Sequence, residues 1–176
     1  SSGCSDGKSK EEVAKNALYV FANQIPTTVN LGLLTFDNSD VKEVVPLASD
    51  NKQAFLTAVN SSQTGGGTPL KSAIAEGIRR LGAQARKQLG YGEYHLVVVT
   101  DGEADYGEDP KDVVNFVVAN TPVVIHTIGF CLDDRHSLNQ VGKTDYKAAT
   151  SPEDLVKGLQ DVLAESESFS VDNFKQ

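Results

Sequence analysis

The chain has 176 residues, enough for one ordinary domain, and its 39% hydrophobic and 23% charged residues exclude collagen-like, disordered and coiled-coil classes. Its 16 basic and 24 acidic side chains leave a formal net charge of -8, which argues against nucleic acid or an anionic membrane as partner and favours a cation or a basic protein. No apolar run approaches the roughly 20 residues of a membrane span, so we expect no direct membrane insertion.

The first third of the chain predicts a helix followed by a hairpin. Ser9-Lys10-Glu11-Glu12 has the pattern of a capping box, so a helix should begin there and end before Pro26. An apolar strand is expected at 29–36, and a turn at 37–40 leads into a second strand at 41–47. The short turn predicts antiparallel pairing, and the proline within the second strand suits a sheet edge.

The rest of the chain alternates helices with apolar strands. Proline is expected at the start of three helices, because the first helical position has no amide hydrogen bond to lose. Helices are predicted at 51–59 and from Pro69, Pro110 and Pro152, and strands at 94–100 and 123–130. The continuous apolar run at 96–99 is typical of a strand that is covered on both faces.

This alternation predicts a doubly wound α/β fold, in which a mostly parallel sheet with one antiparallel edge strand has helices on both faces. We expect one domain over residues 1–169, followed by a tail or linker at 170–176. In such a sheet, the loops that leave the carboxyl ends of the strands converge on a crevice where ligands bind.

Three loops are expected at this crevice, at residues 1–5, 64–70 and 100–103. They offer serine and threonine hydroxyls and the carboxylate of Asp101, without a histidine or thiolate cluster. Hard oxygen ligands of this kind suit Mg²⁺, Mn²⁺ or Ca²⁺ better than zinc or copper. The loops therefore predict a site for a hard divalent cation.

Two of these loops resemble motifs of the von Willebrand factor type A family, whose Rossmann-like fold is shared with integrin I domains. Thr68 lies in Gly-Gly-Gly-Thr-Pro-Leu and Asp101 in Val-Val-Val-Thr-Asp-Gly-Glu, and both segments occur at the matching points of the predicted topology. The resemblance covers nearly the whole chain. It implies a metal-ion-dependent adhesion site in which Thr68 binds the cation directly and Asp101 binds it through water.

The first segment of the family's site, Asp-x-Ser-x-Ser after the first central strand, matches this chain only in part. Neither that strand nor its terminal Asp is present before Ser1, and we expect both to lie upstream. Ser2 then takes the first serine position, whereas Cys4 stands at the second, and Ser5 can serve with a one-residue shift. Because a thiol is a poor ligand for a hard cation, a degenerate site is the alternative.

The two cysteines, Cys4 and Cys131, lack the spacing of a zinc site and by themselves fit either two unpaired thiols or a single disulfide. In the family's sheet order, Cys131 ends the strand two places from the missing one, and Cys4 lies on the same rim. Since neighbouring strands are about 4.8 Å apart, the resemblance brings the two thiols within reach of each other. Our hypothesis is a Cys4–Cys131 bridge.

Other interpretations of these residues stay open. The Thr68 hydroxyl can simply cap the following helix, and the Asp101 carboxylate can bind a backbone amide in its turn. The acidic residues nearby can be solvated, can serve the next helix, or can supply a second cation site or attract a basic partner. They are Glu103, Asp105, Glu108, Asp109 and Asp112. His95, His126 and His136 lack motif partners, and we expect them to be packing or surface residues.

The function that the resemblance implies is divalent-cation-dependent protein binding. A carboxylate from a protein partner would complete the coordination of Mg²⁺, or of Mn²⁺ or Ca²⁺. The ligands from this chain would be Ser2, Ser5, Thr68 and Asp101. Many bacterial proteins with such a module are secreted or membrane-tethered, and this family tendency favours a secreted, periplasmic or membrane-tethered parent protein over a cytoplasmic one.

Two further functions are alternatives to this one. The first is a structural or scaffolding domain with a degenerate metal site. The second is a metal-dependent hydrolase, for which Glu103 is the nearby candidate base. The sequence has no nucleophile elbow, Cys/His pair or zinc signature, so we expect no enzyme activity.

Overall fold

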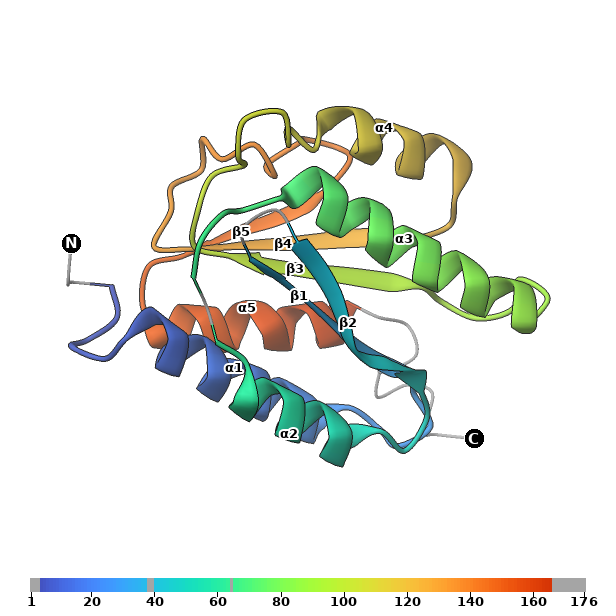
Figure 1. Cartoon of the computed structure of the whole chain (residues 1–176), viewed down its shortest axis with the longest axis horizontal. Coiled ribbons are helices and arrows are strands. Elements are labelled where there is room, and N and C mark those ends of the chain that lie inside the picture. Colours follow the sequence, from blue (N-terminus) through green and yellow to red (C-terminus); the bar gives the residue numbers. More distant parts are fainter. Residues whose placement is uncertain (1–3, 38–39, 64, 166–176) are drawn as a thin grey trace.

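Local signals in the sequence set the boundaries of most helices and strands. A computed structural model describes residues 4–37, 40–63 and 65–165, and its elements follow one another as Figure 1 shows. The helices are α1 (Lys10–Gln24), α2 (Lys52–Ser61), α3 (Leu70–Lys87), α4 (Lys111–Asn120) and α5 (Pro152–Glu165). The strands are β1 (Leu31–Asp37), β2 (Asp40–Ala48), β3 (His95–Thr100), β4 (Val124–Phe130) and β5 (Asp145–Ala149).

The capping box predicted at the start of the first helix is confirmed. The Ser9 amide donates to a Glu12 carboxylate oxygen at 3.0 Å, and the Glu12 amide donates to the Ser9 hydroxyl oxygen at 3.1 Å. Both amides lack a partner inside the helix and are satisfied in this way, so α1 begins at Lys10. The helix ends at Gln24, ahead of Pro26, as the sequence predicts.

The strands form two hydrogen-bonded sheets. β1 and β2 pair antiparallel, with Phe36 opposite Val41, which confirms the predicted hairpin. β3, β4 and β5 pair in parallel in that order, with Val98 opposite Thr127. In the described part of the chain, no strand pairing joins the two sheets. The α/β class with a mostly parallel arrangement is confirmed, and the central strand expected upstream of Ser1 stays a prediction.

Among the described elements, β5 is the one that the sequence does not predict. Its sequence, Asp-Tyr-Lys-Ala-Ala, lacks the β-branched residues that predict β3 and β4. The strand forms because it pairs with β4 along its length, from Asp145 opposite His126 to Ala149 opposite Phe130. This long-range pairing places a carboxylate beside a buried histidine.

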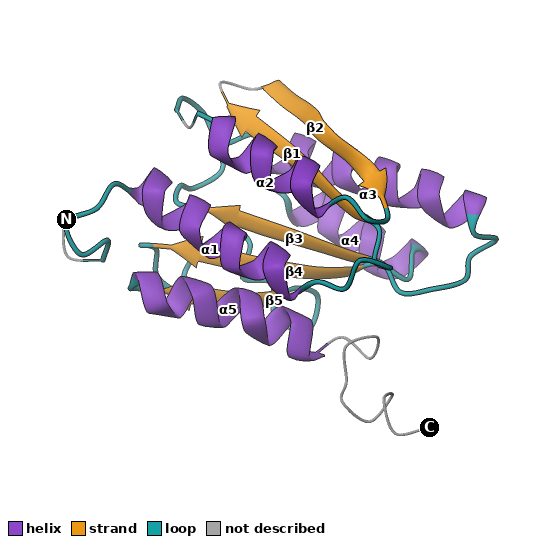
Figure 2. Cartoon of the chain, turned by 90° about the horizontal axis from the view of Figure 1, so that it is seen from below, coloured by secondary structure: helices purple, strands orange, loops and turns teal. Residues whose placement is uncertain are grey.

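Helices cover both faces of the sheets, as the two views in Figures 1 and 2 show. α1 and α5 pack on one face around Ile128 and Phe130, and α3 and α4 pack on the other around Val98 and Ile125. Because strand side chains alternate between faces, β4 supplies residues to both cores, which fixes its register. Among the described helices, none combines the length and the apolarity that crossing a membrane requires.

A disulfide joins the N-terminal segment to the sheet. Cys4 is bonded to Cys131, the residue that follows β4, and their Cα atoms are 5.8 Å apart. The hypothesis of a Cys4–Cys131 bridge is confirmed, and two unpaired thiols are excluded. Ser2 and the expected tail at 170–176 lie outside the described residues.

Candidate metal centre

Thr68 and Asp101 lie on neighbouring loops at the carboxyl edge of the parallel strands. Asp101 directly follows β3, and Thr68 precedes Pro69 at the start of α3. The Thr68 hydroxyl oxygen is 2.9 Å from the position that a Cβ on Gly102 would take. Glycine at this position therefore lets the hydroxyl approach the backbone of the Asp101 turn.

The disulfide places Ser5 on the same edge. Cys4 is bonded to Cys131 directly after β4, so the segment that includes Ser5 lies at the carboxyl ends of the strands (Figure 2). Ser5 is buried, with 8% of its surface exposed, and its carbonyl accepts a hydrogen bond from the Lys8 amide at 3.0 Å. Three of the four predicted ligands thus share one edge, and the fourth, Ser2, lies outside the described residues.

The glycine-rich loop is anchored by the acidic loop that follows β3. The Asp105 carboxylate accepts a 2.7 Å hydrogen bond from the Thr68 amide, and the Asp105 amide donates to the Thr68 carbonyl at 3.0 Å. A Cβ at Gly67 would collide with the Asp105 carboxylate, so glycine is required for this close approach. The two-point contact fixes Thr68 relative to the Asp101 turn.

Asp105 and Glu108 bind the start of α3 and the loop before it, rather than the next helix or solvent. Glu108 accepts hydrogen bonds from the amide and the hydroxyl of Ser72, both at 2.8 Å, in the first turn of α3. This negative charge lies at the positive end of the helix dipole, where it is stabilising. Asp109 does serve the next helix, since it accepts from the Lys111 amide at 2.9 Å.

The Thr68 hydroxyl is not used as a helix cap. The N-cap position of α3 is Pro69, and no side chain at that position makes a capping hydrogen bond. The Ser72 amide in the first turn is bound by Glu108 instead. The interpretation of Thr68 as a simple cap is therefore wrong, and its hydroxyl lies at the Gly102 backbone.

The exposed carboxylate of Asp101 forms an ion pair with a lysine. The Lys10 ammonium at the start of α1 lies 3.6 Å from the Asp101 carboxylate, whose side chain is 55% exposed. The turn amide of Gly102 is bound by the Thr100 hydroxyl at 3.2 Å, so Asp101 does not satisfy that amide. The negative charge of Asp101 thus attracts a cationic group at this part of the edge.

His136 is a buried residue that holds the Asp101 turn, although no motif in the sequence indicates this role. Its Nε2 is 2.8 Å from the Gly102 carbonyl oxygen, and its Nδ1 is 3.0 Å from the Leu138 amide. An amide can only donate, so Nδ1 has the lone pair and Nε2 has the proton. Both ring nitrogens are engaged, which makes His136 a positioning residue.

Carboxylates give this edge of the sheet a negative field. Burial raises the pKa of Tyr146 to about 12, and three nearby carboxylates add to this effect. They belong to Glu103, Asp133 and Asp134. A field of this sign attracts cations and basic protein surfaces.

The groups at this edge fit a hard divalent cation. Their donor atoms are hydroxyl and carboxylate oxygens, which Mg²⁺, Mn²⁺ and Ca²⁺ prefer. Lys10 already places a positive charge beside Asp101, and Gly102 leaves room for the Thr68 hydroxyl. Because Asp101 is more than half exposed, a partner protein can reach a cation held there.

The sequence of this chain is similar to a known domain family and to one bacterial protein. The model of the von Willebrand factor type A domain matches residues 1–174. The uncharacterized protein YwmC from Bacillus subtilis (strain 168) is 24% identical over 170 residues, which cover 86% of this chain and 73% of that protein. This similarity extends across most of both chains.

Solved structures agree with the fold. A von Willebrand factor type A structure from Catenulispora acidiphila aligns with a TM-score of 0.70 at 14% identity, over 87% of this chain and 37% of that chain. The manganese-loaded TRAP protein of Plasmodium vivax aligns with a TM-score of 0.59 at 19% identity, over 82% of this chain and 63% of that chain. This chain thus spans less than two thirds of either structure, and the likeness is one of fold.

Proposed function

Because this chain belongs to the von Willebrand factor type A family, we propose that it binds a protein partner through a divalent cation at the carboxyl edge of its parallel strands. Domains of this family generally act as interaction modules rather than enzymes. The observation that carries the proposal is the position of the Thr68 hydroxyl at the backbone of Gly102, the residue that follows Asp101, whose carboxylate is exposed. Two loops that carry hard oxygen donors thus lie next to each other at one edge of the sheet.

The roles of the proposed ligands follow from the resemblance to the family's metal site. The ligands are Ser2, Ser5, Thr68 and Asp101, with Thr68 binding directly and Asp101 through water. When bound, Mg²⁺, Mn²⁺ or Ca²⁺ supplies a positive charge that attracts a carboxylate of the partner. Hydroxyl ligands are uncharged, so they leave most of that charge for the partner. The manganese in the aligned Plasmodium structure supports Mn²⁺ as the first probe.

The surroundings of Asp101 favour a partner with a carboxylate at the centre of its contact and basic residues around it. Tyr106, in the loop after β3, is fully exposed, and tyrosine is enriched in protein interfaces. Glu103 in the same loop has a side chain that is 60% exposed. Basic groups around the anchoring carboxylate would complement this acidic loop.

Cys4 favours a second candidate function, a structural domain that does not depend on a metal. It stands where the family's motif has its second serine, and its sulfur is bonded to Cys131, so it cannot serve as a ligand. Such a domain would fold and bind its partner equally well in EDTA. The cation-dependent function predicts that EDTA abolishes partner binding.

Isothermal titration of the chain with Mn²⁺ tests the proposed function. We expect one saturable binding event at this edge that Mg²⁺ competes for and EDTA reverses. Calcium sites in extracellular modules have dissociation constants of about 0.1 to 1 mM, and we take this range as the guide for the titration. A chain that binds neither ion at about 1 mM would contradict the proposal.

Replacing Lys10 with glutamine is expected to raise the Mn²⁺ affinity by about two- to fivefold. The ammonium lies 3.6 Å from the Asp101 carboxylate and competes with a metal for the same negative charge. An exposed ion pair of this kind is worth up to about 1 kcal/mol, which sets the size of the effect. Calorimetry should compare Lys10→Gln with Lys8→Gln, which removes the same charge from an exposed neighbouring position. Equal affinities for the two variants would place the metal away from Asp101.

A further inference from the structure

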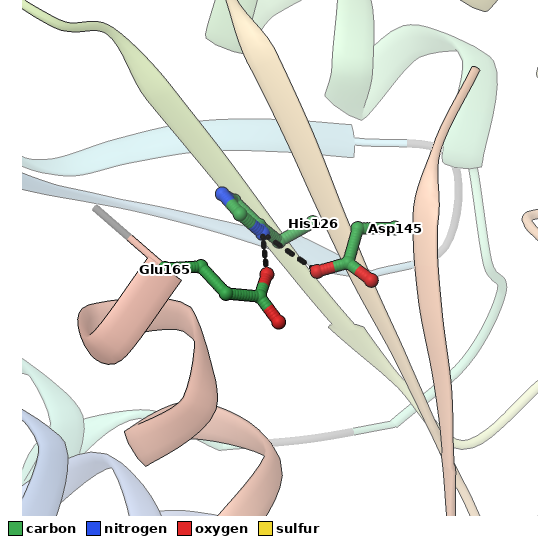
Figure 3. A group of neighbouring side chains, drawn as sticks. All are labelled: His126, Asp145 and Glu165. Carbon is green, nitrogen blue, oxygen red and sulfur yellow. Dashed lines mark hydrogen bonds and ion pairs between the residues drawn. The ribbon is translucent and has the colours of Figure 1, made fainter. Parts of the chain in front are cut away.

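A buried histidine and two carboxylates meet near the amino ends of the parallel strands, at the opposite end from Asp101 (Figure 3). His126 lies on β4, Asp145 begins β5, and Glu165 is at the end of α5. One ligand atom from each residue lies within 4.8 Å of the other two. We propose that these three side chains form a binding site for a divalent metal ion of the zinc class.

The distances among the three side chains suit one metal ion. His126 Nδ1 lies 3.2 Å from Asp145 Oδ2 and 3.9 Å from Glu165 Oε2. Ligand atoms about 2.1 Å from a tetrahedral zinc ion are about 3.4 Å from one another. Figure 3 shows both carboxylates facing the same ring nitrogen, so only small side-chain movements would complete the site.

The hydrogen bonds behind His126 supply an independent argument. Its other ring nitrogen, Nε2, lies 3.0 Å from Nδ1 of His95. Nε2 of His95 in turn lies 3.7 Å from the Glu93 carboxylate. Glu93, His95, His126 and Asp145 therefore form a chain of side chains with three successive polar contacts, called gaps below, each of which needs one proton. A neutral histidine has one ring proton, so the two histidines supply protons for only two of these gaps.

The contact without a hydrogen bond is at His95. Its Nε2 is buried and has no hydrogen-bond partner among the described residues. With both ring protons directed toward Asp145, a lone pair of His95 would face the Glu93 carboxylate. Moving both protons toward Glu93 satisfies His95 but leaves a lone pair of His126 facing two carboxylates. A metal ion removes this conflict, because it binds that lone pair and the carboxylates together.

The cluster also brings two carboxylates to one buried ring nitrogen. The Asp145 and Glu165 carboxylate oxygens lie 3.2 and 3.9 Å from Nδ1 of His126. A divalent cation can balance the charge of two neighbouring carboxylates while it binds the imidazole lone pair.

Lys147 occupies the place of a cation in this cluster. Its ammonium donates to Asp145 Oδ2 at 2.9 Å and to Glu165 Oε1 at 3.2 Å. The side chain is 22% exposed, so its flexible stem can carry the ammonium into solvent when a metal binds. Lys147 is thus a competitor of the metal, and its removal should strengthen metal binding.

Zinc titration of the Asp101→Ala variant tests this site separately from the proposed site at the other edge. We expect one equivalent of Zn²⁺ to bind. Adding Glu165→Gln should weaken the affinity at least tenfold, because loss of even an outer-shell partner lowers metal affinity by about 10- to 100-fold. The matched control is Glu153→Gln, in the exposed first turn of the same helix. Adding Lys147→Gln instead should strengthen zinc binding.

Two results would overturn the metal site. One is the absence of saturable zinc binding, and the other is equal zinc affinity for the Glu165→Gln and Glu153→Gln variants. Nitrogen NMR of the imidazole rings gives a further readout, in which zinc should leave the His126 proton on Nε2. A zinc-bound chain that keeps this proton on Nδ1 would contradict the proposal. Because Asp101 is absent from the test protein, failure of the proposed adhesion site does not alter these outcomes.

Discussion

Replacing Asp101 with alanine is expected to abolish Mn²⁺ binding at the carboxyl edge while the chain keeps its fold. Asp101 supplies the carboxylate of the proposed site, in the turn that the Thr68 hydroxyl approaches at Gly102, and ligand charge changes the affinity of oxygen sites over several orders of magnitude. We expect the affinity to fall roughly a hundredfold or more. Stability should change little, because the side chain is 55% exposed and its ion pair with Lys10 lies at the surface.

Two further variants locate the loss of Mn²⁺ binding at the proposed site. Thr68→Val nearly preserves the side-chain shape without the hydroxyl, and should also weaken binding, because α3 does not use this hydroxyl as a cap. Asp112→Ala removes the same charge as Asp101→Ala from the exposed first turn of α4 and should leave the affinity unchanged. Calorimetry measures the affinity, and thermal melts verify the fold. Equal binding heats for the parent and Asp101→Ala chains would end the cation-dependent account.

Removing the disulfide with the pair Cys4→Ser and Cys131→Ser is expected to lower the free energy of unfolding by about 3 kcal/mol. The bridge joins residues 127 positions apart, and cross-links that close long loops restrict the unfolded chain most. For a chain of this size, that loss corresponds to a decrease of about 6–12 °C in melting temperature. Thermal denaturation followed by circular dichroism measures it.

The same double substitution should also weaken Mn²⁺ binding, because Ser5 follows the bridged Cys4. Cys131 has a φ of 60°, a left-handed conformation that costs a non-glycine residue about 1–2 kcal/mol. Without the bridge, this loop can relax and release the N-terminal segment from the edge. A reductant should reproduce the change in the parent chain and leave the double variant unaffected. Equal melting temperatures of parent and double variant would contradict the prediction.

Most of the fold could be predicted because its signals are local. The capping box of Ser9 and Glu12 acts across three residues, and the prolines act at the helix starts where they stand. Strand β5 could not be predicted in this way. Its residues have weak strand propensity, and hydrogen bonds to β4 decide its conformation.

The candidate metal centre was predicted to a similar extent and for a similar reason. Thr68 and Asp101 stand in motifs that are visible in the sequence. Asp105 and His136, which bind the loops of these two residues, belong to no such motif. Asp105 binds a backbone amide 37 positions away, and His136 binds a carbonyl 34 positions away. Nothing in the neighbouring sequence of either residue indicates such a partner.

The helices, the apolar strands and the two motif segments follow from local sequence, because helix caps and apolar periodicity depend on residues a few positions apart. The long-range pairs depend instead on how the chain packs in three dimensions. They are Thr68 with Asp105, Gly102 with His136, and His126 with Asp145. Hydrogen bonds of this kind require two distant segments to be brought within about 3 Å of each other. Strand pairing and core packing fix that distance, and neither depends on the neighbouring sequence alone.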